Sequence, residues 1–249
     1  MRIEDGMWNH GRVKVLEPGL VIWDIDGTLI PADLRWLRRA IARTYGLGET
    51  DVTFPEKKVH GYTDESIVID TAIASGVSPV DAEAQIGQFA SNLDVVMDEG
   101  RLELRASQPP YPGAIASTAE LHQAGFVQTV LTGNLQSAAE VKLSENGLDA
   151  HLDLRIGGYG SDKRDRFQLP DVVKQRFSRF YNHELDPRKT VVIGDAPNDI
   201  ACARHAGFHV IAVSHRATRA ELEQHAPDVI LDSLDPSRVI PAVKEIVLG

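Results

Sequence analysis

Two carboxylates at the end of a short apolar segment are the side chains of this chain best suited to chemistry. Asp24 and Asp26 follow the apolar run 20–23 and precede Gly27. Side chains alternate along an extended segment, so both aspartates point to one side and Ile25 points away. Like charges held together repel, which disfavours the pair unless a cation or a reaction uses it. The alternative is a surface turn, in which Asp-Gly is common.

A second pair of acids follows the apolar segment 190–193. Asp195 comes directly after Gly194, and Asp199 follows four residues later, at the start of an expected helix. Asp199 has an ordinary structural explanation, because aspartate often caps helix N-termini. Asp195 has none. With the first pair it forms an oxygen-rich set without Cys or His, which suits Mg²⁺ better than Zn²⁺.

Neutral groups that suit a phosphate lie between the two acid pairs. Thr132, Gly133 and Asn134 follow the apolar segment 126–131 and offer a hydroxyl, a backbone amide and a carboxamide where a helix is expected to begin. Such groups can form an anion site. The same triplet is also an ordinary strand-to-helix turn.

The charged loop after Gly160 adds a cation. Lys163 and Arg166 are the two candidates, and Arg164 is expected to be a solvated surface residue. A cation here would neutralise the repulsion between carboxylates and the charge of a transferring phosphoryl group.

Alternating apolar segments and helical patterns indicate the elements that position these groups. Strands are predicted at 20–23, 126–131, 151–156, 190–193, 208–213 and 229–231, and helices over 114–123, 135–146, 170–180, 199–206 and 237–247. This alternation predicts an α/β fold with a doubly wound parallel sheet. In such sheets ligands bind outside the carboxyl ends of the strands, which is where the candidate groups lie.

Residues 33–110 interrupt this alternation and are expected to be helical. Asp33, Thr63 and Ser78 can cap successive helices. The proline-rich run 108–113 breaks the helical pattern and predicts a linker. The expected organisation is a Rossmann-like core domain of residues 1–32 and 111–249 with an inserted helical cap domain over 33–110.

Composition narrows the classes of partner. The chain has 249 residues, with 26 basic and 36 acidic side chains and a net charge of −10, which argues against nucleic acid or an anionic membrane as the main partner. Cys202 is the only cysteine, so no disulfide within the chain and no cysteine-based metal site is expected. Because neither a signal-peptide pattern nor an apolar run of about 20 residues is present, the cytoplasm is the expected location.

The motifs resemble those of the haloacid dehalogenase superfamily of phosphotransferases. The run Asp-Ile-Asp-Gly-Thr at 24–28, Thr132, and the run Gly-Asp-Ala-Pro-Asn-Asp at 194–199 correspond to its first, second and fourth motifs. The resemblance covers nearly the whole chain. The segments 61–64, 112–113, 131–134 and 203–207 resemble the phosphoglycolate-phosphatase-like members in particular.

This resemblance implies a role for each matching residue. Asp24 is the nucleophile that forms an aspartyl-phosphate, and Asp26 protonates the leaving alkoxide and then deprotonates the attacking water. Mg²⁺ is held by Asp24, the backbone carbonyl of Asp26 and Asp195, with Asp199 in support. Thr132 and the amides that follow it hold the phosphoryl oxygens. The dehalogenase and phosphonate-cleaving branches lack an acid at position 26, so hydrolysis of a phosphate ester is favoured.

The third motif departs from the superfamily pattern. A lysine, often followed by proline, usually stands before the helix that precedes the fourth motif. Here Arg166 is the best match and Lys163 is the alternative. Arginine presents a planar fork of donors rather than a point charge, so this replacement is not neutral.

The resemblance also implies that the helical cap closes over the site, excludes water and contacts the substrate. Candidate contacts in its polar segment are Lys57, Lys58, His60, Tyr62 and Thr63. The alternative for the lysines is a solvated surface.

Two other functions fit the same motifs. Phosphomutases of the β-phosphoglucomutase type share all four motifs and would protect the aspartyl-phosphate from water. A non-catalytic protein that binds a phospho-ligand could keep the fold, but it would not need to retain Asp24, Asp26 and Asp195. The favoured prediction is therefore a Mg²⁺-dependent phosphatase that acts on a small phosphate monoester.

Overall fold

A parallel sheet of five strands forms the centre of the molecule. The computed structural model describes residues 19–55 and 62–249. The strands are β1 (Leu20–Trp23), β2 (Val127–Val130), β3 (Thr190–Gly194), β4 (His209–Val213) and β5 (Val229–Leu231), in the spatial order β2-β1-β3-β4-β5. Leu20 pairs with Val127 on one side and with Thr190 on the other. The predicted α/β fold with a parallel sheet is confirmed.

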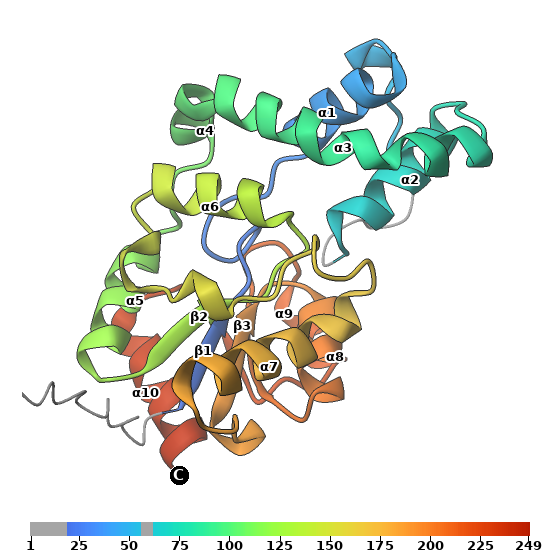
Figure 1. The fold of residues 1–249 in the computed structure, drawn as a ribbon. Helices are drawn as coiled ribbons and strands as arrows, with labels where there is room; N and C mark the ends of the chain where they lie inside the picture. Colours follow the sequence, from blue (N-terminus) through green and yellow to red (C-terminus); the bar gives the residue numbers. More distant parts are fainter. Residues whose placement is uncertain (1–18, 56–61) are drawn as a thin grey trace, which may run out of the picture.

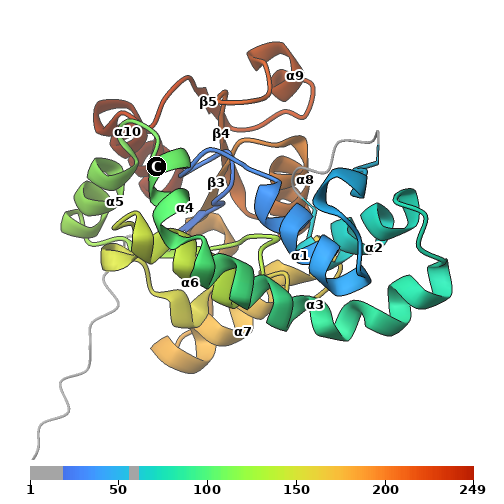
Figure 2. The ribbon, with the colours of Figure 1, turned by 90° about the horizontal axis from the view of Figure 1, so that it is seen from above.

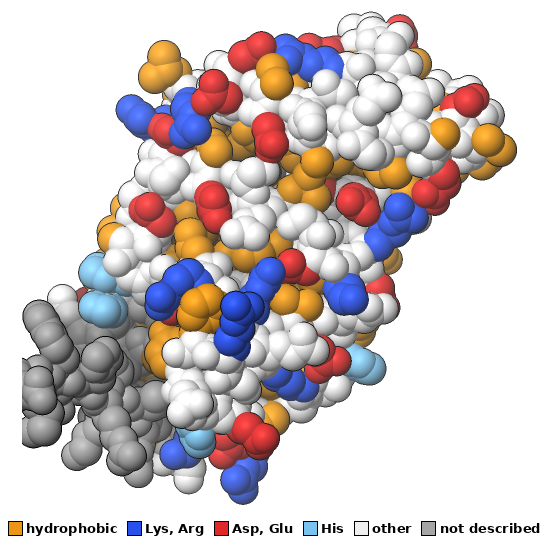
Figure 3. Space-filling model, viewed as in Figure 1, with side chains coloured by type: hydrophobic (Ala, Val, Ile, Leu, Met, Phe, Trp, Pro, Cys, Tyr) orange, Lys and Arg blue, Asp and Glu red, His pale blue; other side chains and the backbone are white. Residues whose placement is uncertain are grey.

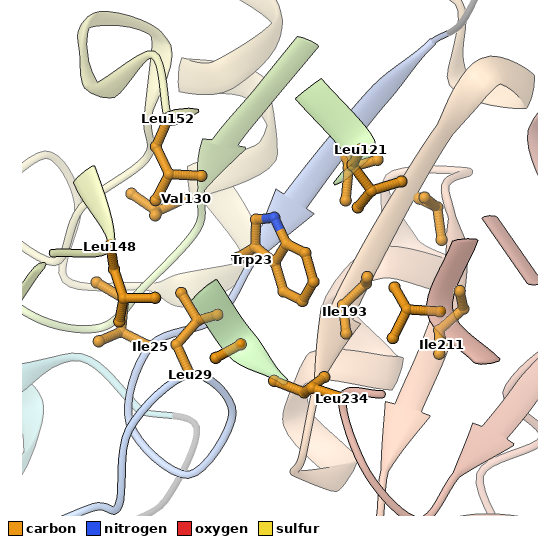
Figure 4. Close-up of a cluster of buried hydrophobic side chains, with 14 of the residues drawn as sticks. Trp23, Ile25, Leu29, Leu121, Val130, Leu148, Leu152, Ile193, Ile211 and Leu234 are labelled. Carbon is orange, nitrogen blue, oxygen red and sulfur yellow. The ribbon is translucent and has the colours of Figure 1, made fainter. Parts of the chain in front are cut away.

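Helices cover both faces of this sheet. They are α5 (Ala114–Gln123), α6 (Gln136–Glu145), α7 (Leu169–Tyr181), α8 (Pro197–His205), α9 (Arg219–Glu223) and α10 (Pro236–Leu248). Alternate residues of β1 enter two separate clusters. Val21 and Trp23 join a cluster with side chains of α5 and α10, shown around Trp23 in Figure 4, whereas Leu20 and Ile22 join one with side chains of α7 and α8. A strand buried on both faces explains the continuous apolar run in the sequence.

A separate helical layer comes between β1 and α5 in the chain. It consists of α1 (Arg35–Tyr45), α2 (Asp64–Ala74), α3 (Pro79–Glu99) and α4 (Arg101–Ser107). Trp36, Ile41, Phe89 and Leu93 are among the residues of its own hydrophobic cluster, which extends to Leu135 beside α6. Figures 1 and 2 show this layer beyond the end of the sheet to which the strands point.

Specific contacts join the helical layer to the rest of the chain. Gln108 accepts a hydrogen bond from Trp36 Nε1 at 2.5 Å and donates one to the carbonyl of Pro31, so the two ends of the insertion meet. At the other end, the Asp64 amide donates to the Gly133 carbonyl at 2.8 Å. A Cβ at Gly133 would lie 1.9 Å from the carbonyl oxygen of Tyr62, so only glycine permits this approach.

The prediction of a strand over 151–156 is wrong. This stretch forms two short 3₁₀ turns, Asp149–His151 and Leu154–Ile156, and the carboxylate of Asp153 accepts a hydrogen bond from the Arg155 amide. Such a side-chain bond to the local backbone competes with sheet pairing. Against β2 the Asp153 amide donates to the Gln128 carbonyl at 2.8 Å, and an isolated bridge joins Leu131 and Gly158.

The expected helix caps had mixed outcomes. Ser78 caps α3, since its hydroxyl accepts from the Asp81 amide at 3.1 Å. Thr63 occupies the N-cap position of α2 without capping it, because its hydroxyl donates to the Arg164 carbonyl at 2.6 Å. At α1 the N-cap residue is Leu34, and Asp33 stands one residue earlier, where it accepts from the Arg35 amide.

The surface carries both signs of charge. On the face shown in Figure 3, acidic and basic side chains are interspersed. Among the described residues, no helix has the length and apolar composition that crossing a membrane requires.

Candidate active site

Three buried carboxylates meet at the carboxyl ends of β1 and β3. Asp24, Asp195 and Asp199 each offer an oxygen within 4.8 Å of the others, and at most 6% of any of these residues is exposed. The parallel register of β1 and β3 causes this meeting, because it brings the ends of both strands to one edge. The Thr28 hydroxyl lies 3.3 Å from Asp195 Oδ1 and 3.5 Å from Asp24 Oδ2.

The turn after β1 requires glycine. Gly27 has a φ of +97°, and a Cβ on it would lie 2.5 Å from Asp195 Oδ2. The backbone at Gly27 therefore passes directly beside the Asp195 carboxylate, and no other residue type permits this approach.

Arg166 joins two of the three carboxylates, Asp24 and Asp199. Its Nη2 atom donates to Asp199 Oδ1 at 2.6 Å, to Asp24 Oδ1 at 3.0 Å and to the Leu131 carbonyl at 3.3 Å. Only 5% of Arg166 is exposed. Asp199 is fully engaged, since its Oδ2 accepts from the Ala196 amide at the start of α8.

Two guanidinium groups face the three carboxylates, because Arg166 pairs with Asp24 and Asp199 while Arg216 Nη1 lies 3.8 Å from Asp195 Oδ2. Burial raises the pKa of Asp24 to about 7, and the charge of Asp199 adds to this rise while Arg166 opposes it. Burial likewise raises the pKa of Asp195 to about 8, with further contributions from Asp199 and Asp24. The surroundings of Asp24 and Asp195 thus disfavour the negative charge of these two carboxylates.

These residues fit a hard divalent cation. The set offers only carboxylate oxygens, and Asp24 and Asp195 retain oxygen atoms that are not tied to a cationic side chain at hydrogen-bonding distance. Mg²⁺ prefers such ligands. Asp199 fits the supporting position expected from the sequence, because its oxygens are bound to Arg166 and to a backbone amide.

Asp26 turns away from this cluster toward the end of β2. Its Oδ2 accepts from Asn134 Nδ2 at 2.7 Å and from Lys142 Nζ at 2.6 Å. Its Oδ1 is buried and has no hydrogen-bond partner among the described residues. Asp24 and Asp26 nevertheless line one pocket.

Thr132 is oriented to donate a hydrogen bond. Its hydroxyl oxygen accepts from Asn134 Nδ2 at 2.7 Å and from the Asn134 amide at 3.2 Å, which leaves its proton for another acceptor. The Asn134 amide and carboxamide are therefore occupied by the protein. All three residues of the expected anion site line the pocket. Of their side chains, the Thr132 hydroxyl is the one that keeps a proton to donate.

Lys142 was missed by the sequence reasoning. It lies on α6, is 5% exposed, and donates to Asp26 Oδ2 and to Asn134 Oδ1, the latter at 2.7 Å. The sequence did contain a pattern that could have indicated its burial. Leu135, Ala138 and Lys142 follow helical spacing, which places the lysine in an apolar stripe of the helix.

The opposite wall of the pocket comes from the helical layer. Its apolar members are Leu34, Trp36, Leu37, Ile67, Leu93 and Met97. Asp64 also lines it, and its carboxylate accepts from the Leu135 amide at 3.1 Å. Burial raises the pKa of Asp64 to about 7, although Lys142 opposes the rise.

Several predicted contact residues lie elsewhere. The structure places Lys163 on an exposed loop outside the pocket, whereas Arg166 lines it. Thr63 is buried but does not line the pocket, whereas Tyr62 does.

The predicted contacts Lys57, Lys58 and His60 fall outside the described residues. Arg164, expected to be solvated, is exposed and pairs with Glu65 and Glu83 of the helical layer.

Comparison with known sequences gives one family and a consistent set of relatives. Residues 18–207 match the sequence model of the haloacid dehalogenase-like hydrolases. A phosphoglycolate phosphatase from Agrobacterium fabrum is 28% identical over 229 residues, which cover 91% of this chain and 92% of that protein. One from Mesorhizobium japonicum is 22% identical and covers 87% and 91%.

Solved structures share the fold. A hydrolase from Pseudomonas syringae has a TM-score of 0.64 at 17% identity, covering 92% of this chain and 99% of that one. CbbY from Rhodobacter sphaeroides, solved in complex with phosphate, has a TM-score of 0.63 at 20% identity, covering 87% and 94%. At these identities the likeness concerns the fold alone.

Proposed function

The chain belongs to the haloacid dehalogenase-like hydrolases, and from this premise we propose that it is a Mg²⁺-dependent phosphatase that cleaves a small phosphate monoester through phosphorylated Asp24. The observation that carries this proposal is the meeting of Asp24, Asp195 and Asp199, beside a pocket that Asp24, Asp26 and Arg166 line. The phosphoglycolate phosphatases among its relatives support a small phosphate ester as the substrate.

The first half of the reaction transfers the phosphoryl group to the protein. The Asp24 carboxylate attacks phosphorus, an oxygen–phosphorus bond forms on Asp24, and the bond from phosphorus to the leaving oxygen breaks. Asp26 donates a proton to that oxygen. The Thr132 hydroxyl, whose oxygen already accepts two hydrogen bonds from Asn134, donates a hydrogen bond to a phosphoryl oxygen.

The second half restores the protein. Asp26, now a carboxylate, takes a proton from water as the water oxygen attacks phosphorus, and the bond between Asp24 and phosphorus breaks to release inorganic phosphate. Arg166 stays bound to Asp24 Oδ1 and Asp199 and holds the nucleophile in place.

A magnesium ion would be held by Asp24, Asp195 and the backbone carbonyl of Asp26, with Asp199 in support. When bound, it offsets the negative charge of the carboxylates and of the phosphoryl group. The three buried acids, which face only the two positive charges of Arg166 and Arg216, support this assignment.

The helical layer fits a cap domain. We assign residues 33–110 this role because their helices supply one wall of the pocket while the sheet supplies the reacting carboxylates. Such a wall excludes water from the site and contacts the leaving group.

The test is phosphate release from a panel of small phosphate monoesters, phosphoglycolate and 4-nitrophenyl phosphate included. The wild-type protein and Asp24→Asn are each assayed with Mg²⁺ and with EDTA. We expect release that requires Mg²⁺ and falls at least about 10³-fold in the variant, because an amide is a poor nucleophile. Substantial turnover by Asp24→Asn would remove Asp24 from the mechanism. No release from any ester would contradict the phosphatase proposal.

A further inference from the structure

A buried lysine on α6 has no role in the mechanism above. The Lys142 side chain is 6% exposed, and its ammonium group pairs with Asp26 Oδ2 at 2.6 Å. Burying an ammonium group is unfavourable unless it is paired and hydrogen-bonded. An apolar residue would suit this stripe of α6 better, so the lysine must be explained by its partners.

Both partners of Lys142 face the pocket. Its Nζ atom donates to Asp26 Oδ2 and to Asn134 Oδ1, and both residues line the pocket, as Lys142 itself does. Asp64 lies close enough for the charge of Lys142 to affect its pKa. The ammonium group thus connects α6 to the segments that follow β1 and β2.

The bond to Asn134 sets the orientation of that carboxamide. Lysine can only donate, so the oxygen of the carboxamide faces Lys142 and its nitrogen faces the other way. That nitrogen donates to Asp26 Oδ2 at 2.7 Å and to Thr132 Oγ1 at 2.7 Å. A flipped carboxamide would direct its oxygen at the Asp26 carboxylate.

The result is that one oxygen of Asp26 accepts two hydrogen bonds, while the other is buried and accepts none from the described residues. Oδ2 accepts from both Lys142 and Asn134, whereas Oδ1 has no hydrogen-bond partner among the described residues. A carboxyl group fixed through one oxygen presents the other in a defined direction, and proton transfer requires such geometry.

We propose that Lys142 is a positioning residue that holds Asp26, directly and through Asn134, so that Asp26 Oδ1 faces the leaving oxygen of the phosphate ester. This inference rests on the proposed function, because it assigns Asp26 the transfer of a proton to that oxygen as the phosphorus–oxygen bond breaks.

The dependence of the rate on the leaving group tests this role. Benzyl, phenyl and 4-nitrophenyl phosphate have similar shapes, but their leaving oxygens need a proton to a decreasing extent. We measure kcat/KM, which reports the steps up to formation of the phosphorylated protein, for the wild-type protein and for Lys142→Met. Lys244→Met is the matched control, because Lys244 is exposed on α10.

We expect Lys142→Met to lower kcat/KM for benzyl phosphate about 10-fold more than for 4-nitrophenyl phosphate, since a general acid contributes about 10²–10⁴-fold and a misplaced one loses part of this. In the Asp26→Asn background, Lys142→Met should add less than about 3-fold to the loss, because both changes remove the same proton transfer. Lys244→Met should leave all three rates unchanged.

Equal losses on all three esters, or losses that multiply with those of Asp26→Asn, would overturn the positioning role. Thermal unfolding checks each variant, and Lys142→Gln replaces Lys142→Met in every comparison if the latter does not fold. If the wild-type protein hydrolyses none of the esters with Mg²⁺, the proposed function fails and this inference fails with it. If the wild-type protein is active and the losses are equal, only this inference fails.

Discussion

The two walls of the pocket differ in chemical character, since one is charged and the other is mostly apolar. The wall at the sheet carries charged groups that contact one another, with Arg166 between Asp24 and Asp199 and Lys142 on Asp26. The wall at the helical layer is mostly apolar, and Trp36, Leu93 and Met97 are each almost fully buried. Apart from Asp33 and Asp64, its described members carry no ionisable carboxylate or ammonium group.

This difference separates two tasks. Charged groups at strand ends can stabilise a phosphoryl group and move protons, and they act on any phosphate ester. Apolar side chains act on whatever the phosphate is attached to, since they contribute contact area and exclude water. Changes in the sheet wall should therefore affect the rate on every substrate, and changes in the helical wall should affect the choice among substrates.

The largest effect is expected from Arg166→Ala in the sheet wall. It leaves Asp24 and Asp199 buried without their shared cation, and breaking a buried ion pair in this way destabilises a protein by about 3–5 kcal/mol. We expect kcat/KM to fall at least about 100-fold on every ester, because the nucleophile loses its support. Urea unfolding and steady-state kinetics measure the two effects.

The matched control for this change is Lys163→Ala on the neighbouring exposed loop. It should leave both stability and rate close to wild type. If Lys163→Ala lowers the rate and Arg166→Ala does not, the cation of the third motif has been assigned to the wrong residue.

An intermediate effect is expected from Ile67→Ala in the helical wall. Ile67 lines the pocket and is 7% exposed. Loss of apolar contact with the leaving group should raise KM about 10-fold for bulky esters with little change in kcat, because the contact is equal in the ground state and the transition state. Ile73→Ala, at an exposed position of the same helix, is the control. A uniform fall in kcat on all esters would contradict the division of tasks.

The smallest effect on the rate is expected from Asp64→Asn, at the boundary between the walls, where the pH dependence of stability should change instead. Because burial raises the pKa of Asp64 to about 7, the folded protein binds this proton more tightly than the unfolded chain. The free energy of unfolding of the wild-type protein should therefore decrease as the pH rises from about 4 to about 7, and the asparagine variant should lack this contribution. A shift from 3.8 to about 7 implies that the variant gains about 3–4 kcal/mol relative to wild type across that range, at about 1.4 kcal/mol per pKa unit.

Thermal unfolding between pH 4 and pH 8 measures this gain. Asp171→Asn, at an exposed position of α7, should show no such trend. A constant difference between Asp64→Asn and the wild-type protein at every pH would show that burial does not perturb this carboxyl group.

The core of the site was predictable because it depends on local sequence and sheet geometry. Apolar runs followed by Asp24, Thr132 and Asp195 mark strand ends, and parallel strands bring their carboxyl ends to one edge. The structure places these three residues together, and it confirms the α/β fold. The prediction of a strand over 151–156 failed because Asp153, which stands between apolar residues, bonds through its side chain to the local backbone.

Side-chain partners could not be predicted in the same way. Lys163 and Arg166 lie three residues apart in one charged loop, and only the packing of that loop against β1 and α8 decides that Arg166 enters the cluster. Lys142 stood in an apolar stripe, but the sequence does not show which groups its ammonium reaches.

The sequence by itself determined which residues lie at the strand ends, because strand periodicity and turn chemistry are local properties of the chain. Only the tertiary structure decided the pairing of Asp26 with Lys142 and of Asp24 with Arg166. Each pair joins residues more than 100 positions apart, and burial makes such a pairing necessary only once the chain has folded around it.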